Sequence, residues 1–355
     1  MPYTAETRVL QVNPEHPQAD LIEQAAAVIR SGGLVAFPTE TVYGLGANAT
    51  DPDAVDHIFS AKQRPAIDPL IVHIASVDQL PSVALDVPEI GRELTALWPG
   101  ALTLILKRHP SIPPNVSAGL DTVGVRVPSH PVAHALIQAA GVPIAAPSAN
   151  TFSRPSATTA AHVLEDLQGR VDLVLDGGAS TFGIESTIVD VTSDPPRILR
   201  YGAIKPEMFE SLGFSTADHL NTGDEGAAKP APGMMLKHYS PRARLMFYGD
   251  GSPVDAILAQ MQTDARIFVS EGFRVGILAP DSENSAFAGI DAVVISLGSN
   301  LDEIAARLFA ALRELDHANV DVILARGYER RGIGAALWER LLRAAEGEIV
   351  QVRKK

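Results

Sequence analysis

The chain contains no cysteine, which excludes disulfide frameworks, thiolate catalysis and every zinc or iron–sulfur site that needs a cysteine ligand. Neither an HExxH zinc motif nor a GxxxxGK[ST] phosphate-binding loop occurs, so we expect no dedicated metal centre. No apolar run approaches the roughly 18 residues of a membrane span, and no signal peptide is visible. These absences together predict a cytoplasmic protein without a membrane contact.

Positive charge is also scarce. The net charge is −13, and residues 1–210 hold 13 lysines and arginines against 23 aspartates and glutamates. Such a balance argues against a general nucleic-acid binder. An anionic ligand would need a few cations gathered in one place, which directs attention to Lys62, Arg64, Lys107, Arg108 and Arg126.

A length of 355 residues favours two domains. Residues 1–213 mix amphipathic helices with short apolar strands, several of which follow one another, so the pattern predicts an α/β domain with a mixed sheet. Residues 214–242 lose all periodicity and have the composition of a linker. Residues 243–355 alternate strands and helices, which predicts a small doubly wound, Rossmann-like parallel sheet.

The stretch "AKQRPAIDPLIVHI" places Lys62 and Arg64 at the end of a predicted helix, just before a buried-looking strand. Cations there can complement the helix dipole, and a proline can end the helix. The alternative is that the two cations bind an anionic ligand. The stretch taken alone leaves both interpretations open.

Polar residues also follow or interrupt apolar strands elsewhere. Ser148 and Asn150 in "APSANTFSRPSATT" could cradle an anion or simply form a Ser- and Asn-rich turn. Arg126 in "VGVRVP" needs a carboxylate or phosphate partner, either in a structural ion pair or in a ligand site. His73 lies inside a strand, where a histidine is usually a satisfied core residue.

Two short patterns indicate other chemistry only weakly. Gly44-x-Gly46-x-x-Ala49 is a loose dinucleotide fingerprint, but no helix starts directly after it. Arg331-Gly332-Ile333-Gly334-Ala335-Ala336 matches an acetyl-CoA pattern that is common at helix starts.

Several longer motifs together resemble a YrdC-like domain: "PTETVYGLGANAT", Lys-x-Arg with "PLIVHI", "WPGALTLIL", "VGVRVPSHP", "APSANTFSRPS" and "ESTIVDV". The linker sequence "KPAPGMMLKHYSP", followed by a small α/β domain, is similar to the long, two-domain form of the threonylcarbamoyl-AMP synthase family. The resemblance covers nearly the whole chain. It is strong in residues 33–205, distinctive in the linker and weak in the C-terminal domain.

The resemblance implies a nucleotidyltransferase that makes threonylcarbamoyl-AMP and pyrophosphate from L-threonine, bicarbonate and ATP. The product would pass to a tRNA threonylcarbamoyl transferase complex for tRNA modification. Mg²⁺ would enter with ATP, held largely by phosphate and water, because no acidic metal cluster is visible.

By the same resemblance, Lys62 and Arg64 are the candidate catalytic cations. The candidate ATP-binding residues are Lys62, Arg64, Asp68, Thr122, Ser148, Asn150, Ser156, Arg200, His238 and Tyr239. The candidate residues for threonine and its carbamate are Thr41, His73, Arg126, Ala146 and Ser186.

Two alternative functions belong to other classes. One is an RNA-binding YrdC-like module, which the charge balance limits to a weak RNA contact. The other is an acetyl-CoA-dependent acetyltransferase in the C-terminal domain. Met234, Met235, Leu236 and Tyr239 are unusual in a spacer. The linker is therefore either an active-site lid or packing between the domains.

Overall fold

A computed structural model describes residues 3–210, 212, 214–216 and 227–352 of the chain. The chain divides into two compact units. The first unit comprises Met1–Phe152 and Ser156–Met235, and the second comprises Ser153–Pro155 and Leu236–Lys355. Among the described residues, no helix combines the length and the apolar character needed to cross a bilayer.

The described part of the first unit contains a 12-stranded sheet with the order β1-β9-β2-β3-β8-β4-β7-β6-β10-β11-β12, and β5 pairs with β6. Parallel pairs such as β4–β7 alternate with antiparallel pairs such as β6–β7, which confirms the predicted mixed sheet. The strands are β1 (Arg8–Gln11), β2 (Val35–Phe37), β3 (Gly44–Asn48), β4 (Ile71–His73), β5 (Ala84–Leu85), β6 (Leu102–Arg108), β7 (Thr122–Arg126), β8 (Ile144–Ala145), β9 (Leu173–Asp176), β10 (Thr187–Asp190), β11 (Arg197–Arg200) and β12 (Ser215–Thr216).

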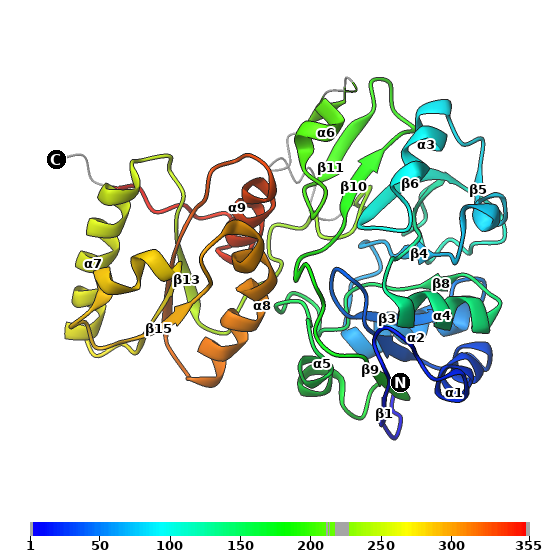
Figure 1. Cartoon of the computed structure of the whole chain (residues 1–355), viewed down its shortest axis with the longest axis horizontal. Coiled ribbons are helices and arrows are strands. Elements are labelled where there is room, and N and C mark those ends of the chain that lie inside the picture. Colours follow the sequence, from blue (N-terminus) through cyan, green and yellow to red (C-terminus); the bar gives the residue numbers. More distant parts are fainter. Residues whose placement is uncertain (1–2, 211, 213, 217–226, 353–355) are drawn as a thin grey trace. The chain divides into compact units, whose positions relative to one another are not determined.

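Helices cover both faces of this sheet (Figure 1). Alternate residues of β2 show why: Ala36 belongs to one apolar cluster, and Val35 and Phe37 belong to the other. A strand that is buried on both faces has apolar residues at successive positions rather than at alternate ones. The helical segments are α1 (Ala19–Arg30), α2 (Pro52–Lys62), η1 (Val77–Ser82), α3 (Glu89–Leu94), η2 (Thr95–Leu97), α4 (Pro131–Ala140), α5 (Ala160–Leu167) and α6 (Pro206–Glu210), with η marking 3₁₀ helices.

Helix α2 begins and ends as its sequence dictates. The Asp51 side chain accepts hydrogen bonds from the backbone N–H groups of Asp53 and Ala54, and Pro52 occupies the first helical position. At the other end Gln63 adopts a left-handed conformation with φ of 55°, which turns the chain out of the helix directly after Lys62.

The loose dinucleotide fingerprint proves to be strand β3 rather than a phosphate-binding turn. A Cβ atom on Gly46 would lie only 2.8 Å from side-chain atoms of Ile144 and Phe37. Glycine is therefore required here for close packing between strands, and the pattern gives no support to a dinucleotide site.

The second unit contains a four-stranded parallel sheet of order β13-β16-β14-β15. This confirms the predicted small parallel α/β domain. Helix α7 lies on one face, and α8 and α9 lie on the other (Figure 1). The elements are β13 (Arg244–Tyr248), α7 (Val254–Ser270), β14 (Val275–Ala279), η3 (Asp281–Phe287), β15 (Ala292–Ser296), α8 (Leu301–His317), β16 (Val322–Arg326) and α9 (Ile333–Ala344).

Part of the predicted linker packs on the first unit. Ala231 and Met234 join an apolar cluster with Ile71 of β4 and Ile188 of β10. The Lys229 backbone N–H donates to the carbonyl of Ile67 at 3.1 Å. Residues 217–226 of the predicted linker lie outside the described residues.

Candidate active site

Lys62, the last residue of α2, is turned inward. Its side chain is only 1% exposed, and its ammonium donates to the backbone carbonyl oxygens of Ser148, at 2.5 Å, and Asn150. Burial, followed by the positive charge of Arg64, lowers the pKa of Lys62 well below its usual value. The ammonium is therefore held by two backbone carbonyls inside the first unit rather than in water at the helix end, and the assignment of Lys62 to a ligand stays a prediction.

Arg64 lies directly after this helix end and is also buried. Its Nε donates to the Asp68 carbonyl at 3.0 Å, and its Nη2 donates to the Pro69 carbonyl at 2.7 Å. Nη2 also lies 2.9 Å from the Asp68 carboxylate. Burial raises the pKa of Asp68, although Arg64 acts against that rise. Asp68 therefore fixes the loop and the guanidinium together.

Arg200 at the end of β11 and Ser186 just before β10 form a second buried group. Arg200 donates to the Ser186 carbonyl at 3.0 Å and to its hydroxyl at 3.2 Å. Its Nη1 donates to the carbonyl of Pro232 at 3.1 Å. The Ser186 hydroxyl is also 2.8 Å from the Thr103 hydroxyl. Both predicted site residues are thus in contact, although they were assigned to different ligands.

Arg126, at the end of β7, has three different partners. Nη1 donates to the Thr41 hydroxyl at 2.9 Å, Nε donates to the Gly100 carbonyl at 3.1 Å, and Nη2 lies 2.6 Å from the Glu40 carboxylate. Burial alone would raise the pKa of Glu40, but Arg126 and backbone N–H groups outweigh it and hold this pKa below its usual value. The pair therefore stays charged.

His73 stands beside Arg126 because β4 and β7 pair in parallel with these two residues in register. Its ring lies edge-on to Phe37, with 6.4 Å between centroids. Burial, followed by the charge of Arg126, lowers the pKa of His73 to about 3, so the ring is neutral. Ala146 is buried nearby, and its N–H donates to the Ile71 carbonyl at 2.9 Å.

The remaining candidates of the first unit are less closely joined. Ser156 donates its hydroxyl proton to the Glu185 carboxylate at 2.6 Å. Asn150 donates to the Thr151 carbonyl at 2.8 Å. Thr122 starts β7 opposite Lys107, and no hydrogen bond joins it to the other candidates among the described residues.

The other residues singled out in the sequence lie elsewhere. Lys107 is exposed and pairs with Asp86 at 2.8 Å. His238 and Tyr239 belong to the second unit, where the ring of Tyr239 stacks on that of Phe309 with 5.2 Å between centroids. Their assignment to the ATP site stays a prediction.

The charge of the first unit's cluster is the property that matters most. Four buried cations, Lys62, Arg64, Arg126 and Arg200, each donate to at least one backbone carbonyl. The carboxylates of Asp68 and Glu40 pair directly with Arg64 and Arg126. Carbonyl dipoles orient a cation without cancelling its charge, so the donors that are held by carbonyls alongside these two ion pairs are suited to an anionic ligand.

Sequence reasoning missed Glu40 and Thr103, and it assigned no role to Glu185. Glu40 and Thr41 are neighbours in "PTETVYG", and a buried arginine elsewhere in the chain signals that a carboxylate must lie near it. That signal does not say which of the many acidic residues is the partner. No cluster of three or more histidine, aspartate or glutamate side chains suited to a metal occurs in the described part of the chain.

Comparison with known families gives two matches that follow one another along the chain. Residues 27–202 match the family model described as "Telomere recombination". Residues 204–346 match the model described as "Threonylcarbamoyl-AMP synthase, C-terminal domain".

Similar proteins agree with both matches. Threonylcarbamoyl-AMP synthase of Pyrococcus abyssi is 43% identical over 333 residues, which cover 93% of this chain and 96% of the relative. The synthase of Bacillus subtilis is 42% identical over 93% of this chain and 94% of its own length. A crystal structure of P. abyssi Sua5 complexed with L-threonine superimposes with a TM-score of 0.91 at 41% identity, covering 98% of this chain and 100% of that chain.

Proposed function

This chain belongs to the threonylcarbamoyl-AMP synthase family of enzymes, and we propose that it makes threonylcarbamoyl-AMP and pyrophosphate from L-threonine, bicarbonate and ATP. The proposal places the enzyme among the nucleotidyltransferases. The observation that carries it is the group of buried cations in the first unit, oriented by backbone carbonyls. The P. abyssi relative described as complexed with L-threonine supports the amino-acid substrate.

The reaction needs no nucleophile from the protein. The threonine amine attacks the carbon of bicarbonate and forms a carbamate, and water leaves. A carbamate oxygen then attacks the α-phosphorus of ATP, the bond to the bridging β-phosphate oxygen breaks, and its electron pair leaves with pyrophosphate. The protein must therefore align two reactants and stabilise negative charge that moves from one phosphate to the next.

Lys62, Arg64 and Arg200 are suited to the phosphates. The guanidinium of Arg64 can bind phosphate oxygens in a bidentate manner. Burial holds the pKa of Lys62 low, and an incoming polyanion would act in the opposite direction and favour its charged form. Asn150 and Ser156, whose side chains are buried, are the proposed contacts to phosphate or sugar oxygens.

Arg126, Thr41 and His73 are suited to threonine. The Arg126 guanidinium can bind a carboxylate or carbamate, and Glu40 holds it in position at 2.6 Å. The Thr41 hydroxyl already lies within hydrogen-bonding distance of that guanidinium. A neutral His73 offers a hydrogen bond without adding charge, and Ala146 offers a small apolar wall for a methyl group.

Mg²⁺ would accompany ATP as part of the substrate. Of the carboxylates beside the proposed ligand contacts, Asp68 and Glu40 are each paired with an arginine, and Glu185 accepts a hydrogen bond from Ser156. We propose that phosphate oxygens and water hold the ion, and that it neutralises phosphate charge there. The adenylate product is a labile mixed anhydride, which is suited to passing its threonylcarbamoyl group to an acceptor. We propose that this acceptor is a tRNA threonylcarbamoyl transferase complex.

The test is a set of omissions. Purified full-length protein should release pyrophosphate and form an AMP-linked product only when threonine, bicarbonate, ATP and Mg²⁺ are all present. Serine and glycine serve as matched controls, because a site for both a methyl and a hydroxyl group should discriminate by at least about 1 kcal/mol. Equal turnover with either amino acid, or pyrophosphate release without bicarbonate, would contradict the proposal.

A further inference from the structure

The second unit has a topological switch point at β13 and β16, which are neighbours in the sheet. The chain leaves β13 toward α7 on one face, and it leaves β16 toward α9 on the other face (Figure 1). In open parallel sheets, ligands bind where two adjacent strands send their connections to opposite faces, because the loops diverge at the carboxyl ends and leave space between them.

A cavity of about 720 Å³ lies at this position. Its walls come from the loop Gly249–Ser252 after β13, from Arg326 at the end of β16 and residues 327–330 after it, from Trp338 of α9, and from Ile349 and Gln351. Its size falls within the range of small-molecule sites, roughly 300–1,000 Å³. The cavity is lined only by residues of the second unit, so it is separate from the candidate active site.

Two glycines shape the inner wall. A Cβ atom on Gly249 would lie 2.4 Å from the Phe247 ring and 3.1 Å from the Trp338 indole nitrogen. A Cβ atom on Gly327 would lie 3.0 Å from the Trp338 ring. The Trp338 indole nitrogen is itself 3.4 Å from the Gly249 carbonyl oxygen. Glycine at both strand ends therefore allows the indole to lie against the backbone and line the cavity.

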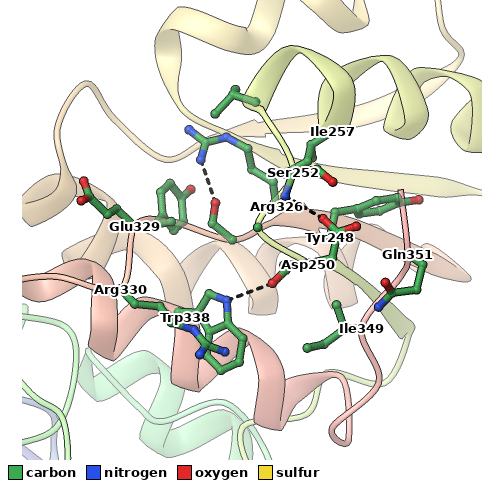
Figure 2. A pocket seen from close by; sticks show the side chains of 15 residues that line it. Tyr248, Asp250, Ser252, Ile257, Arg326, Glu329, Arg330, Trp338, Ile349 and Gln351 are labelled. Atoms are coloured by element: carbon green, nitrogen blue, oxygen red, sulfur yellow. Dashed lines mark hydrogen bonds between the residues drawn. The ribbon is translucent and has the colours of Figure 1, made fainter. Parts of the chain in front are cut away.

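A planar cation covers that indole. The guanidinium carbon of Arg330 lies 3.4 Å from the centroid of the Trp338 ring. Figure 2 shows this stack on one side of the pocket, with Ile349 and Gln351 on the other side. Guanidinium planes and aromatic rings are the platforms on which nucleobases stack. The wall thus suits a flat, aromatic ligand.

The charges of the pocket argue against a polyanion. Arg326 is neutralised by Glu283, with its Nη2 2.6 Å and its Nε 2.8 Å from the carboxylate oxygens. Among the other lining residues, the carboxylates of Asp250 and Glu329 outnumber the single guanidinium of Arg330. A triphosphate would therefore be repelled, whereas a neutral ligand would not.

Hydrogen-bonding groups complete the site. Ser252, Glu329 and Gln351 bring a hydroxyl, a carboxylate and an amide to the same cavity. Such groups can bind sugar hydroxyls and the polar edge of a base. Val254 and Ile257 add an apolar side. We propose that this switch-point pocket binds a nucleoside, with the base stacked on Arg330 and the sugar hydroxyls bound by the acidic side of the pocket.

The chain offers a direct probe, because it has only two tryptophans, Trp98 and Trp338. A full-length Trp98→Phe protein leaves Trp338 as the sole indole reporter in the pocket. Titration with adenosine should change its fluorescence saturably. ATP should bind several-fold more weakly, because its phosphates meet Asp250 and Glu329. No saturable change with adenosine, confirmed by equilibrium dialysis, would overturn the proposal.

Variants place the binding in the pocket. Arg330→Ala should weaken adenosine binding about tenfold, the equivalent of one stacking interaction. Val254→Phe should also weaken adenosine binding, because the larger side chain fills the cavity while the stack of Arg330 on Trp338 stays unchanged. Arg266→Ala, at an exposed position of α7, is the matched control and should bind as before. Equal affinity in Arg330→Ala and Arg266→Ala would overturn the assignment.

Two further experiments distinguish ligand binding in the pocket from the proposed catalysis in the first unit, and show whether the nucleoside is free or part of an RNA chain. Lys62→Met should reduce pyrophosphate release about 100- to 1,000-fold and leave the Trp338 signal intact. Loss of that signal would place the ligand in the first unit instead and overturn the proposal. A short oligoadenylate that binds as well as adenosine would assign the pocket to a base within an RNA chain. Tight binding of adenosine alone would assign it to a free nucleoside.

Discussion

Each unit holds an arginine at the end of a strand, Arg200 in β11 and Arg326 in β16, and the two arginines have different hydrogen-bond partners. In the first unit, Arg200 donates to the backbone carbonyls of Ser186 and Pro232 and to the Ser186 hydroxyl. In the second unit, Arg326 is bound on both nitrogens by Glu283. Backbone carbonyls orient a cation and leave its charge available to a ligand, whereas a bidentate carboxylate neutralises that charge. The first arrangement suits a polyanion and the second suits a neutral ligand.

The largest expected effect is on catalysis in the first unit. Lys62→Met should reduce pyrophosphate release about 100- to 1,000-fold, because a preoriented donor to the reacting phosphates is lost. Arg330→Ala in the second unit should leave the rate within about twofold. Initial rates at saturating substrates measure both. Similar losses in the two variants would erase the distinction between the units.

The next effect concerns stability. Glu40→Gln leaves the buried Arg126 without its carboxylate and should destabilise the first unit by about 3–5 kcal/mol. Glu283→Gln makes the same change beside Arg326, where both side chains are more exposed, and should cost the second unit about 1.5–3 kcal/mol.

Each unit has its own reporter for this measurement. Trp338→Phe leaves Trp98 to follow unfolding of the first unit by denaturant, and Trp98→Phe leaves Trp338 to follow the second. A larger loss for Glu283→Gln than for Glu40→Gln would reverse the predicted order of the two ion pairs.

A smaller effect is pH-dependent. The pKa of His73 is about 3 in the folded chain and about 6.5 when unfolded, so the unfolded state binds the extra proton between these values. Protonation of His73 in the unfolded chain therefore lowers the free energy of unfolding as the pH falls below 6.5, by about 2 kcal/mol at pH 5. Above pH 6.5 the effect is absent. His73→Gln should remove this part of the pH dependence of Trp98-monitored unfolding, and the exposed His16→Gln should not.

The smallest effect is expected at the surface. Lys107 and Asp86 form an ion pair in which both side chains are exposed, so water screens it. Lys107→Ala should change neither the rate of pyrophosphate release nor the unfolding midpoint of the first unit. A clear loss of activity would contradict this prediction and indicate that Lys107 contributes to the proposed phosphate site.

Local sequence signals were enough for most of the fold. Asp51 and Pro52 mark the start of α2, and alternating strands and helices after residue 243 indicate the parallel sheet. Pairing between strands that lie far apart in the sequence could not be predicted from local patterns. Strand β1 is exposed along most of its length and, among the described residues, pairs with the distant β9; no prediction included it.

The candidate site was predictable to a similar degree. The positions of Lys62, Arg64 and Arg126 follow from cations placed beside apolar strands, and the structure buries all three. Which carboxylate pairs with Arg126 depends on the three-dimensional arrangement of β7 and the "PTET" loop, and local sequence does not encode it. The proximity of Arg200 to Ser186 has the same origin, because β10 and β11 pair with a register shift.

The docking of residues 229–234 has a consequence for dissecting the chain. Pro232 supplies a carbonyl to Arg200, and Met234 covers Ile71 and Ile188. A fragment that ended near Gly213, at the boundary the composition suggests, would expose that apolar patch and remove one of the acceptors that orient Arg200. An autonomous first unit should instead be cut after Met235, so that residues 229–234 stay with the sheet on which they pack.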